Sequence, residues 1–242
     1  MSKTILITGA ATRIGRHLAL GLAKQDWHVL IHYHSSEEQA ASLIEETRSF
    51  GGKTDSLKAD LHDPAQVSQL IDRAAHMAGT PLNALINNAS IYQPDLATDF
   101  QLEQLNRQMR VNLDAPLILA RDFARQLPVS YKGCIINMID QRVLRPAPDF
   151  FTYTLSKQAL YAATKTLAQA LAPNIRVNAV GPGPTLPSVY QTDAEFQREV
   201  NATLLKTGSP PDSILQAVQF LLDADAVTGQ MIAVDGGQHL EV

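Results

Sequence analysis

Three side chains near the middle of the sequence could together transfer protons beside a bound substrate. Tyr153 and Lys157 are four residues apart, which places both on one face of a helix. A Tyr hydroxyl has a pKa of about 10, and a neighbouring ammonium group lowers that pKa by favouring the phenolate. Asp140 ends an apolar run and could bring a carboxyl group to the same place. Taken alone, the Tyr-x-x-x-Lys spacing also fits an ordinary pair on a helix surface.

A second candidate site is the glycine-containing turn 8–15, which reads Thr-Gly-Ala-Ala-Thr-Arg-Ile-Gly. It joins a predicted buried strand at 4–8 to a predicted helix at 14–24. Such a turn lets the backbone approach a pyrophosphate, which the N-terminus of the following helix binds. Because only Gly9 and Gly15 frame it, a tight turn without a ligand is the alternative.

Polar residues follow the second predicted strand, 28–33, where a dinucleotide-binding fold contacts the adenosine ribose. An NAD site would place Asp or Glu there, whereas this chain has His34, Ser35 and Ser36. These side chains can accept a 2′-phosphate and carry no repelling charge, so the sequence predicts NADPH rather than NADH. The alternative is a polar loop in which Ser36 caps a predicted helix at 37–50.

Other polar residues also lie where they could contact a ligand. Asn87 and Asn88 follow the predicted strand 82–86 and suit either a ligand-facing loop or a turn bonded by its own side chains. Tyr92 could stack on a planar substrate or simply cover the core. Asn112 lies inside the predicted helical stretch 102–127, where Asn is unfavourable, so we predict a kink with a functional amide.

The order of predicted elements indicates a single α/β Rossmann domain over 1–242, with a seven-stranded parallel sheet flanked by helices on both faces. The remaining strands are expected at 53–58, 134–139, 175–180 and 231–237, and the remaining helices at 64–78, 152–171 and 212–222. In such sheets ligands bind beyond the carboxyl ends of the strands, and the glycine turn, Asn87-Asn88, Asp140 and Gly181 all fall there. The segment 184–207 has weak periodicity and is predicted to be a substrate lid with a short helix at 193–204.

Composition narrows the classes of function. The 242 residues carry a net charge of -4, which gives no basic surplus for binding nucleic acid or anionic membranes. The single cysteine, Cys134, excludes an intramolecular disulfide and gives no metal cluster. No apolar run approaches the roughly 20 residues of a membrane helix, and the first predicted strand begins too early for a signal peptide. We therefore expect a soluble, cytoplasmic protein.

Over essentially its whole length the chain resembles the short-chain dehydrogenase/reductase family. The matching motifs are Thr8-Gly9-x-x-x-x-x-Gly15, Asn87-Asn88-Ala89, Asn112, Tyr153-x-x-x-Lys157, Pro182-Gly183 and Val234-Asp235-Gly236-Gly237. The resemblance implies hydride transfer between NAD(P)(H) and a carbonyl or imine, in a homo-oligomer that we expect to be a homotetramer. It implies that Tyr153 is the acid/base, that Lys157 binds the nicotinamide ribose and lowers the Tyr pKa, and that Asn112 supports a proton-relay water.

Two departures from the general family pattern resemble its pteridine reductase branch. Asp140 stands thirteen residues before the Tyr, where most members carry Ser, and Arg13 lies in the glycine turn. The string His32-Tyr33-His34 and the position of Tyr92 are similar to the branch as well. Ser35 differs, because these reductases often have Arg there, and this removes a strong partner for a 2′-phosphate.

The branch resemblance implies a pterin held between the nicotinamide and an aromatic ring. The residues then expected to contact the pterin are Arg13, Tyr92, Asp140 and Tyr153. Those expected to contact NADPH are Gly9, Arg13, Ile14, Tyr33, His34, Ser35, Ser36, Asp60, Leu61, Asn88, Ala89, Ser90, Lys157, Pro182 and Gly183. The expected catalytic set is Asp140, Tyr153, Lys157 and Asn112.

The chemistry of a dihydropterin agrees with these residues. Reduction of its C=N bond needs a hydride and a proton on nitrogen, and Asp140 could supply or relay that proton if burial holds its pKa near neutral. Alternatively, Asp140 is a loop carboxylate that binds nearby backbone N–H groups. Two other functions stay open at this point: a reductase of ketones such as a 3-oxoacyl thioester or a sugar, and a cofactor-sensing protein without turnover.

Overall fold

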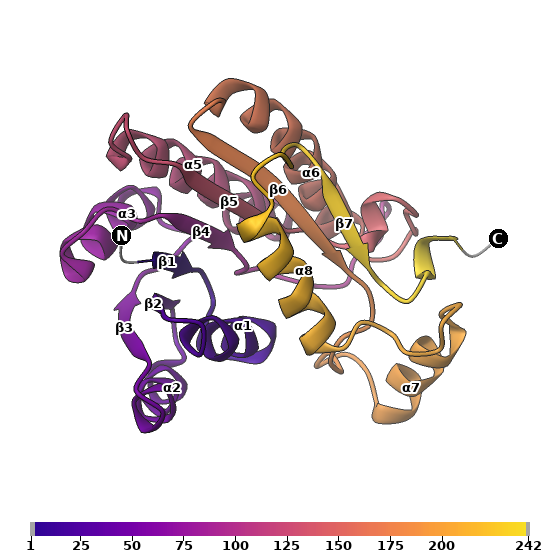
Figure 1. Ribbon diagram of the computed structural model, residues 1–242. Helices are drawn as coiled ribbons and strands as arrows, with labels where there is room; N and C mark the ends of the chain where they lie inside the picture. Colours follow the sequence, from indigo (N-terminus) through magenta and orange to yellow (C-terminus); the bar gives the residue numbers. More distant parts are fainter. Residues whose placement is uncertain (1–2, 241–242) are drawn as a thin grey trace.

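The computed structural model describes residues 3–240, and its centre is one parallel sheet with the strand order β3-β2-β1-β4-β5-β6-β7 (Figure 1). The strands are β1 Lys3–Ile7, β2 Trp27–Tyr33, β3 Lys53–Lys58, β4 Ala84–Asn87, β5 Gly133–Met138, β6 Ile175–Pro182 and β7 Met231–Val234. The order reverses between β1 and β4, which is where doubly wound sheets open a ligand crevice. The predicted α/β fold with seven parallel strands is confirmed; residues 1, 2, 241 and 242 of the predicted 1–242 domain lie outside the described part.

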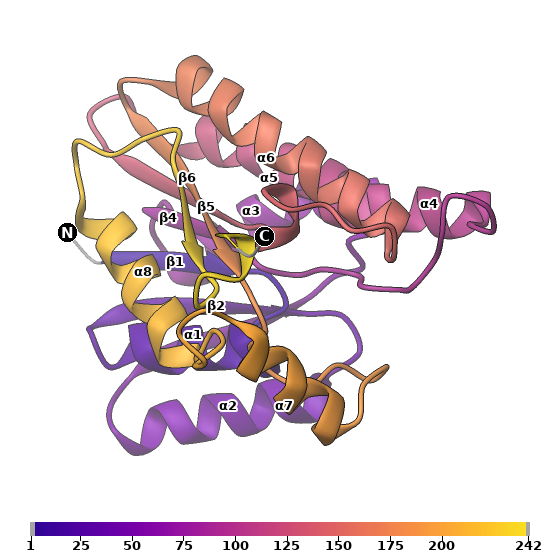
Figure 2. The ribbon, with the colours of Figure 1, turned by 90° about the vertical axis from the view of Figure 1, so that its right-hand side faces the viewer.

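Helices cover both faces of the sheet, as Figure 2 shows. One layer contains α1 Arg13–Ala23, α2 Glu37–Ser49 and α8 Pro211–Asp223, and the other contains α3 Pro64–Ala78, α5 Ala115–Gln126 and α6 Phe151–Leu171. The central strand β1 serves both layers because successive side chains point to opposite faces. Ile5 and Ile7 pack in the core under the first layer, and Leu6 packs in the core under the second. This explains why β1 is apolar throughout and does not alternate.

The predicted helix at 102–127 is interrupted. It consists of α4 Leu102–Met109, a π-helical turn Arg110–Asp114 and α5. Asn112 lies in the π-helical turn and is buried. Pro116 at the start of α5 has no N–H to bond the carbonyl of residue 112, so the regular ladder cannot continue. The helix is irregular at Asn112, where we predicted a kink, and single π turns of this kind are frequent at functional sites; the function predicted for the amide stays a prediction.

The helix ends confirm one expectation and correct another. Helix α7 spans Asp193–Ala202, close to the helix predicted inside 184–207. Thr192 and Glu195 form a reciprocal capping box at its start. Ser36 precedes α2 as predicted, but its side chain makes no capping hydrogen bond, so the predicted cap is wrong. The first turn of α2 instead carries Glu37 and Glu38, whose charges favour the N-terminus of a helix.

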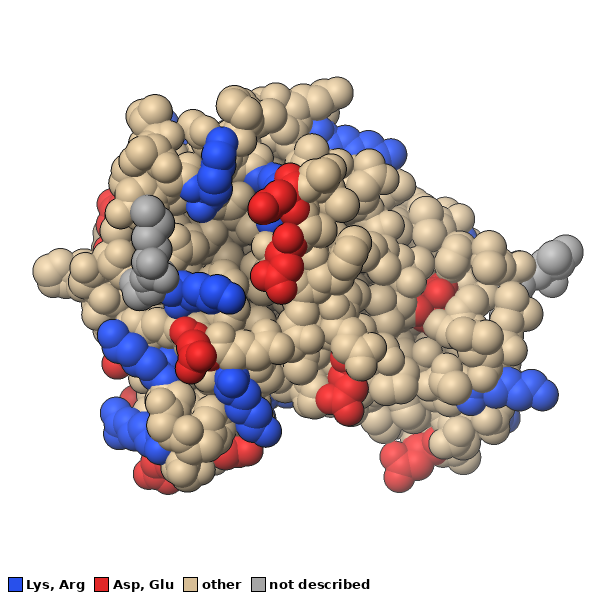
Figure 3. Space-filling view, viewed as in Figure 1, with Lys and Arg blue, Asp and Glu red and all other residues tan. Residues whose placement is uncertain are grey.

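The surface in Figure 3 carries both signs of charge, with Lys and Arg interspersed among Asp and Glu. Among residues 3–240, no helix is both long and apolar enough to cross a membrane. The same residues contain no group of three or more His, Cys, Asp or Glu side chains that could hold a metal ion.

Candidate active site

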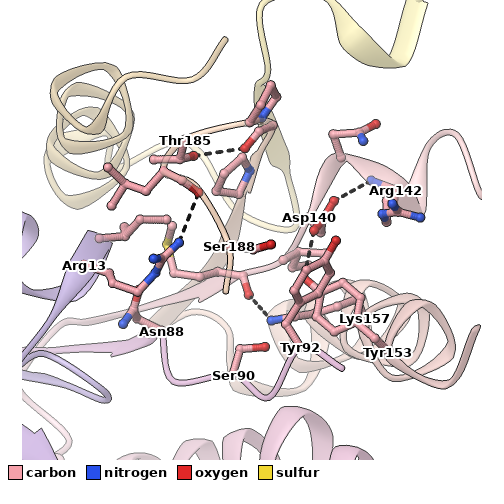
Figure 4. Close-up of a pocket in the computed structure, with 18 of the residues that line it drawn as sticks. Arg13, Asn88, Ser90, Tyr92, Asp140, Arg142, Tyr153, Lys157, Thr185 and Ser188 are labelled. Carbon is pink, nitrogen blue, oxygen red and sulfur yellow. Dashed lines mark hydrogen bonds between the residues drawn. The ribbon is translucent and has the colours of Figure 1, made fainter. Parts of the chain in front are cut away.

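Two adjoining cavities lie at the carboxyl ends of the central strands. The first has a volume of about 410 Å³ and is lined by the glycine turn, the loop after β4, the residues after β5, the start of α6 and the segment after β6 (Figure 4). The second has a volume of about 780 Å³ and is lined by residues after β2, β3 and β4. Gly9, Ala89 and Ser90 line both cavities, so the two spaces meet at the switch point of the sheet.

The predicted proton-transfer group is assembled in the first cavity. The Tyr153 hydroxyl donates a hydrogen bond of 2.8 Å to Asp140 Oδ2. Asp140 Oδ1 accepts a hydrogen bond of 2.9 Å from the backbone N–H of Arg142. Lys157 Nζ donates to the carbonyl oxygen of Met138 at 2.8 Å (Figure 4), and it lies 5.7 Å from the centre of the Tyr153 ring. The alternative interpretation of Asp140, a loop carboxylate bound to backbone, therefore describes one of its two oxygens.

Burial dominates the proton affinities of these three groups. The Asp140 carboxyl faces the cavity but has protein on its other sides; this burial raises its pKa, and the hydrogen bonds from Arg142 N–H and the Tyr153 hydroxyl oppose the rise. Burial and then the negative charge of Asp140 raise the pKa of Tyr153 well above its ordinary value. Burial lowers the pKa of Lys157 to about 8.

The expected lowering of the Tyr153 pKa by Lys157 is therefore wrong for this arrangement. The Lys157 ammonium group lies 5.7 Å from the centre of the Tyr153 ring, whereas the Asp140 carboxyl accepts the hydroxyl proton directly. A negative charge in contact with a phenol opposes loss of the phenol proton. In this structure Tyr153 therefore keeps its proton to a higher pH than a free phenol does.

An aromatic stack adjoins this group. The Tyr92 and Phe150 rings are stacked, with centroids 4.0 Å apart and planes 7° from parallel. Tyr92 also meets the Tyr153 ring edge-on at 4.8 Å. Phe150 has a φ of 52°, a left-handed conformation that is costly for an aromatic residue. The surrounding structure thus holds Phe150 against Tyr92, which lines the cavity, and fixes the plane of the Tyr92 ring.

Arg142 adds a cation to the cavity wall. Its guanidinium group donates to both carboxylate oxygens of Asp149, at 2.8 and 3.2 Å, and lies 5.2 Å from the centre of the Phe150 ring. Although burial works against the charge, the bonds with Asp149 raise the pKa of Arg142. The guanidinium group is therefore a permanent charge whose terminal nitrogens are already engaged.

The glycine turn is shaped for close approach by a ligand or by neighbouring backbone. A Cβ at Gly15 would lie 2.3 Å from the carbonyl oxygen of Gly9, and Gly9 itself has a φ of 62°. Asn88 holds the turn from β4, because its amide nitrogen donates to the carbonyl oxygens of Thr8 and Gly9 at 2.8 and 3.2 Å. The interpretation of Asn87 and Asn88 as bonded within the protein is supported for Asn88, which also lines the first cavity.

A buried histidine supports the same turn from β2. His32 Nδ1 accepts a hydrogen bond of 3.1 Å from the backbone N–H of Gly9, so His32 Nε2 carries the proton that faces the carbonyl oxygen of Ala59 at 3.1 Å. Burial lowers the pKa of His32 to about 4. A neutral imidazole thus links the glycine turn to the end of β3.

Arg13 reaches toward the predicted lid. Its guanidinium nitrogens donate to the carbonyl oxygens of Pro187 and Leu186 at 2.9 and 3.1 Å (Figure 4). Arg13 has a φ of 52°, so its backbone, like that of Phe150, is held in a left-handed conformation beside the cavity. The side chain ties the segment after β6 to the glycine turn, a role that the sequence did not predict.

Most of the predicted ligand-contacting residues line one of the two cavities. Those lining the first are Gly9, Arg13, Ile14, Asn88, Ala89, Ser90, Tyr92, Asp140, Tyr153, Lys157, Pro182 and Gly183. His34, Asp60 and Leu61 line the second. Four predicted residues line neither of these cavities: Tyr33, Ser35, Ser36 and Asn112.

Asn112 is fully engaged behind the site. Its amide oxygen accepts from the backbone N–H of Ile91 at 2.8 Å and from the Ser90 hydroxyl at 3.2 Å. Its amide nitrogen donates to the carbonyl oxygen of Ile91 at 2.9 Å and to the Ser156 hydroxyl at 3.0 Å. Asn112 therefore connects the loop after β4 to α6, and its predicted link to a proton-relay water stays a prediction.

Several site residues were missed by the sequence reasoning. Arg142, Glu199 and Gln238 line the first cavity, and Phe150 backs Tyr92. Arg142 and Phe150 fall inside the stretch 140–157 that the sequence singled out, so their proximity to Asp140 was available as a signal. Glu199 lies in the predicted lid 184–207, so the lid prediction was available as a signal for it, whereas nothing in the sequence singled out Gln238.

Comparison with known proteins places the chain in a class. The family described as short chain dehydrogenase matches residues 3–198. This chain belongs to the short-chain dehydrogenase family and is therefore an oxidoreductase.

Individual relatives extend over the whole chain. The crystal structure of FolM alternative dihydrofolate reductase 1 from Brucella canis, complexed with NADP, is 40% identical, has a TM-score of 0.96, and covers 99% of this chain and 95% of that chain. A short-chain type dehydrogenase/reductase from Picea abies is 31% identical over 98% of this chain and 92% of its own length. The 3-oxoacyl-[acyl-carrier-protein] reductase FabG of Staphylococcus epidermidis is 28% identical over 99% of this chain and 100% of its own length.

Proposed function

We propose that this protein is an NADPH-dependent pteridine reductase that converts a dihydropterin, of the dihydrobiopterin or dihydromonapterin type, to the tetrahydropterin, with dihydrofolate as a further candidate substrate. The observation that carries the proposal is the 2.8 Å hydrogen bond between Tyr153 and Asp140, a carboxyl group where most family members have Ser. The likeness to a FolM alternative dihydrofolate reductase supports the same substrate class.

The residues of the two cavities fit a dinucleotide. The glycine turn has no room for a Cβ at Gly15, and the cavities meet at Gly9, so an extended ligand could run from one to the other. The similar Brucella structure contains NADP. We assign the nicotinamide end to the cavity with Lys157 and the adenosine end to the cavity with His34 and Asp60. When bound, NADPH supplies the hydride.

Asp140 and Tyr153 hold the proton that the imine nitrogen requires. Burial raises the pKa of Asp140, and the pKa of Tyr153 is also raised, so both groups keep a proton at higher pH than they would in water. A nitrogen that gains negative charge as the carbon is reduced can take the proton from this pair. Lys157 sets the local charge and is held by the Met138 carbonyl oxygen. We assign Tyr92 to the open face of the substrate ring, because Phe150 already covers the other face of Tyr92.

The direct test is oxidation of NADPH by the purified protein with 7,8-dihydrobiopterin, followed by loss of the reduced-nicotinamide absorbance and identification of the product. We expect turnover, and we expect Asp140→Ala to abolish it. Asp72→Asn on the exposed side of α3 removes a carboxylate outside both cavities and should leave the rate unchanged.

A ketone reductase is the second candidate, because the chain also resembles FabG reductases over its full length. The same assay with a 3-oxoacyl thioester separates the two functions. Turnover of the thioester without turnover of any dihydropterin selects the ketone reductase. Asp140→Ser gives a sharper separation: improved ketone reduction with unchanged pterin turnover would show that the proposed role of Asp140 is wrong. Tight NADPH binding with no hydride transfer to any substrate would favour a sensor.

A further inference from the structure

The lid helix α7 presents a carboxylate to the substrate cavity. Glu199 lies near the C-terminal end of α7 and lines the same cavity as Tyr92 and Tyr153. The capping box of Thr192 and Glu195 stabilises the start of this helix, so Glu199 is carried by an ordered element.

Neutral groups hold this carboxylate in place. Gln191 Nε2 donates to Glu199 Oε2 at 2.8 Å, and Gln238 Nε2 donates to Glu199 Oε1 at 3.1 Å. Gln191 belongs to the segment before α7, and Gln238 follows β7, so two separate parts of the chain fix the orientation of Glu199. Amide donors stabilise a carboxylate by hydrogen bonding without cancelling its charge.

The cations that line the cavity are engaged elsewhere. Within residues 3–240, Glu199 has no Lys, Arg or His nitrogen within 4.0 Å; the cavity cations Arg142, Arg13 and Lys157 bind Asp149, lid carbonyl oxygens and the Met138 carbonyl oxygen. The negative charge of Glu199 is therefore uncompensated at short range. The charge of Glu199 also acts on Tyr92. Burial is the main cause that raises the pKa of Tyr92 to about 12, and the negative charge of Glu199 adds to the rise.

Tyr92 and Glu199 line the same cavity, so we infer that a pterin ring placed against Tyr92 has its side chain on the side of Glu199. An uncharged hydroxylated side chain can bind there, because a carboxylate and the neighbouring amides accept and donate hydrogen bonds. A side chain that ends in carboxylates, such as the glutamyl tail of a folate, meets a like charge in a partly desolvated cavity, and like-charge contacts oppose binding.

We propose that Glu199 is a specificity determinant that selects pterins with an uncharged side chain over pterins with an anionic one. This inference rests on the proposed pteridine reductase function. It adds a selection by the side chain of the pterin. In the proposed function, the catalytic group contacts only the pterin ring and the cofactor site contacts only the dinucleotide, so neither provides this selection.

The test compares three dihydropterins whose side chains carry zero, one and two carboxylates: dihydrobiopterin, dihydropteroate and dihydrofolate. For the wild-type protein we expect kcat/KM to fall along this series. Glu199→Gln removes the charge and keeps one acceptor oxygen, and its new amide nitrogen can face Gln238 Oε1 if the Gln238 amide turns over, because that oxygen has no hydrogen-bond partner. In this variant we expect the ratio of kcat/KM for dihydrofolate to that for dihydrobiopterin to rise about tenfold, the scale of one unit charge at moderate screening. In Glu199→Lys the ratio should rise further.

Asp193→Asn is the matched control, because it removes an exposed carboxylate from the same helix, outside the cavity. It should leave the ratio unchanged, and high salt should shrink the wild-type discrimination but not that of Glu199→Gln. A ratio unchanged in Glu199→Gln, or an equal change for all three substrates, overturns the charge-selection role while the reductase function stands. Absence of turnover with every dihydropterin overturns both.

Discussion

The two halves of the site are built by different means. On the side of β1 and β2, the glycine turn is held by backbone groups and neutral side chains: the amide of Asn88 and the imidazole of His32. On the side of β5 and α6, the cavity wall consists of ionisable groups in contact with one another, above all Asp140 and Tyr153. The first half offers a ligand a rigid backbone surface, and the second offers it groups whose pKa differs from the ordinary value.

The difference between the two halves follows from what binding a dinucleotide and transferring a proton each require. A dinucleotide phosphate is bound by close backbone approach, so the first half must exclude side-chain atoms from the turn. A reaction that moves a proton requires groups whose pKa is displaced by their surroundings. Burial raises the pKa of both Asp140 and Tyr153, and the charge of Asp140 adds to the rise for Tyr153. Substitutions that remove an ionisable group should therefore impair catalysis in the second half. Substitutions that add side-chain volume to the glycine turn should impair dinucleotide binding in the first.

The largest expected effect is in the half built from ionisable groups. Asp140→Asn keeps the size of the side chain but removes the acid, so kcat for a dihydropterin should fall by about 10²- to 10⁴-fold. Binding of NADPH, measured by fluorescence titration, should change little, since Asp140 is assigned to the substrate. Equal losses of NADPH affinity and of kcat would assign Asp140 to the cofactor half.

The pH profile sharpens the same prediction. Burial raises the pKa of Asp140, so the protonated acid is depleted as pH rises through that raised value, and the wild-type rate should decline on the alkaline side. The residual rate of Asp140→Asn should lack this decline. A decline at the same pH in both proteins would point to another group.

The next effect concerns the neutral histidine under the glycine turn. Burial lowers the pKa of His32 from 6.5 to about 4, so between these values the unfolded chain binds more protons than the folded one, and stability is lost as pH falls from 6.5 to 4. The loss from this residue amounts to roughly 3 kcal/mol at most. Urea unfolding at a series of pH values would measure it. His32→Gln should flatten this part of the profile, and an unchanged profile would contradict the assignment.

A smaller expected effect tests the shape of the turn by added volume. Gly15→Ala would place a Cβ 2.3 Å from the Gly9 carbonyl oxygen, a backbone atom that cannot turn aside. We expect a loss of about 1–3 kcal/mol in the free energy of unfolding, as for other overpacked sites, and at least tenfold weaker NADPH binding by titration. Gly21→Ala on the same helix meets only the flexible end of Leu215 and should keep full NADPH affinity.

The smallest effect concerns the lid. Thr192→Ala removes the capping box of α7 and should cost about 1 kcal/mol of helix stability. We expect faster proteolytic cleavage within 184–207 and a KM for dihydropterin raised a few-fold, with kcat for bound substrate little changed. Thr166→Ala on the exposed side of α6 is the control. A lid that is cleaved no faster in Thr192→Ala would show that Arg13 and the glutamines hold it without the cap.

The sequence by itself determined the elements and their order, because strand and helix periodicity, glycine positions and the spacing of Tyr153 and Lys157 are local properties. It also predicted that Asp140 would meet Tyr153, since both follow elements that end at one edge of a parallel sheet. The capping role of Ser36 was predicted wrongly: its backbone has φ -95° and ψ 56°, outside the extended conformation that is typical of an N-cap residue.

Only the tertiary structure decided the proton affinities and the lid contacts. The direction of the Tyr153 pKa depends on whether Lys157 or Asp140 touches the hydroxyl, and spacing along the chain does not fix that contact. The convergence of Glu199 and Gln238 on the cavity likewise joins segments that share no periodic pattern. Burial and charge contacts depend on distances between elements, so they arise only when the packed fold brings those elements together.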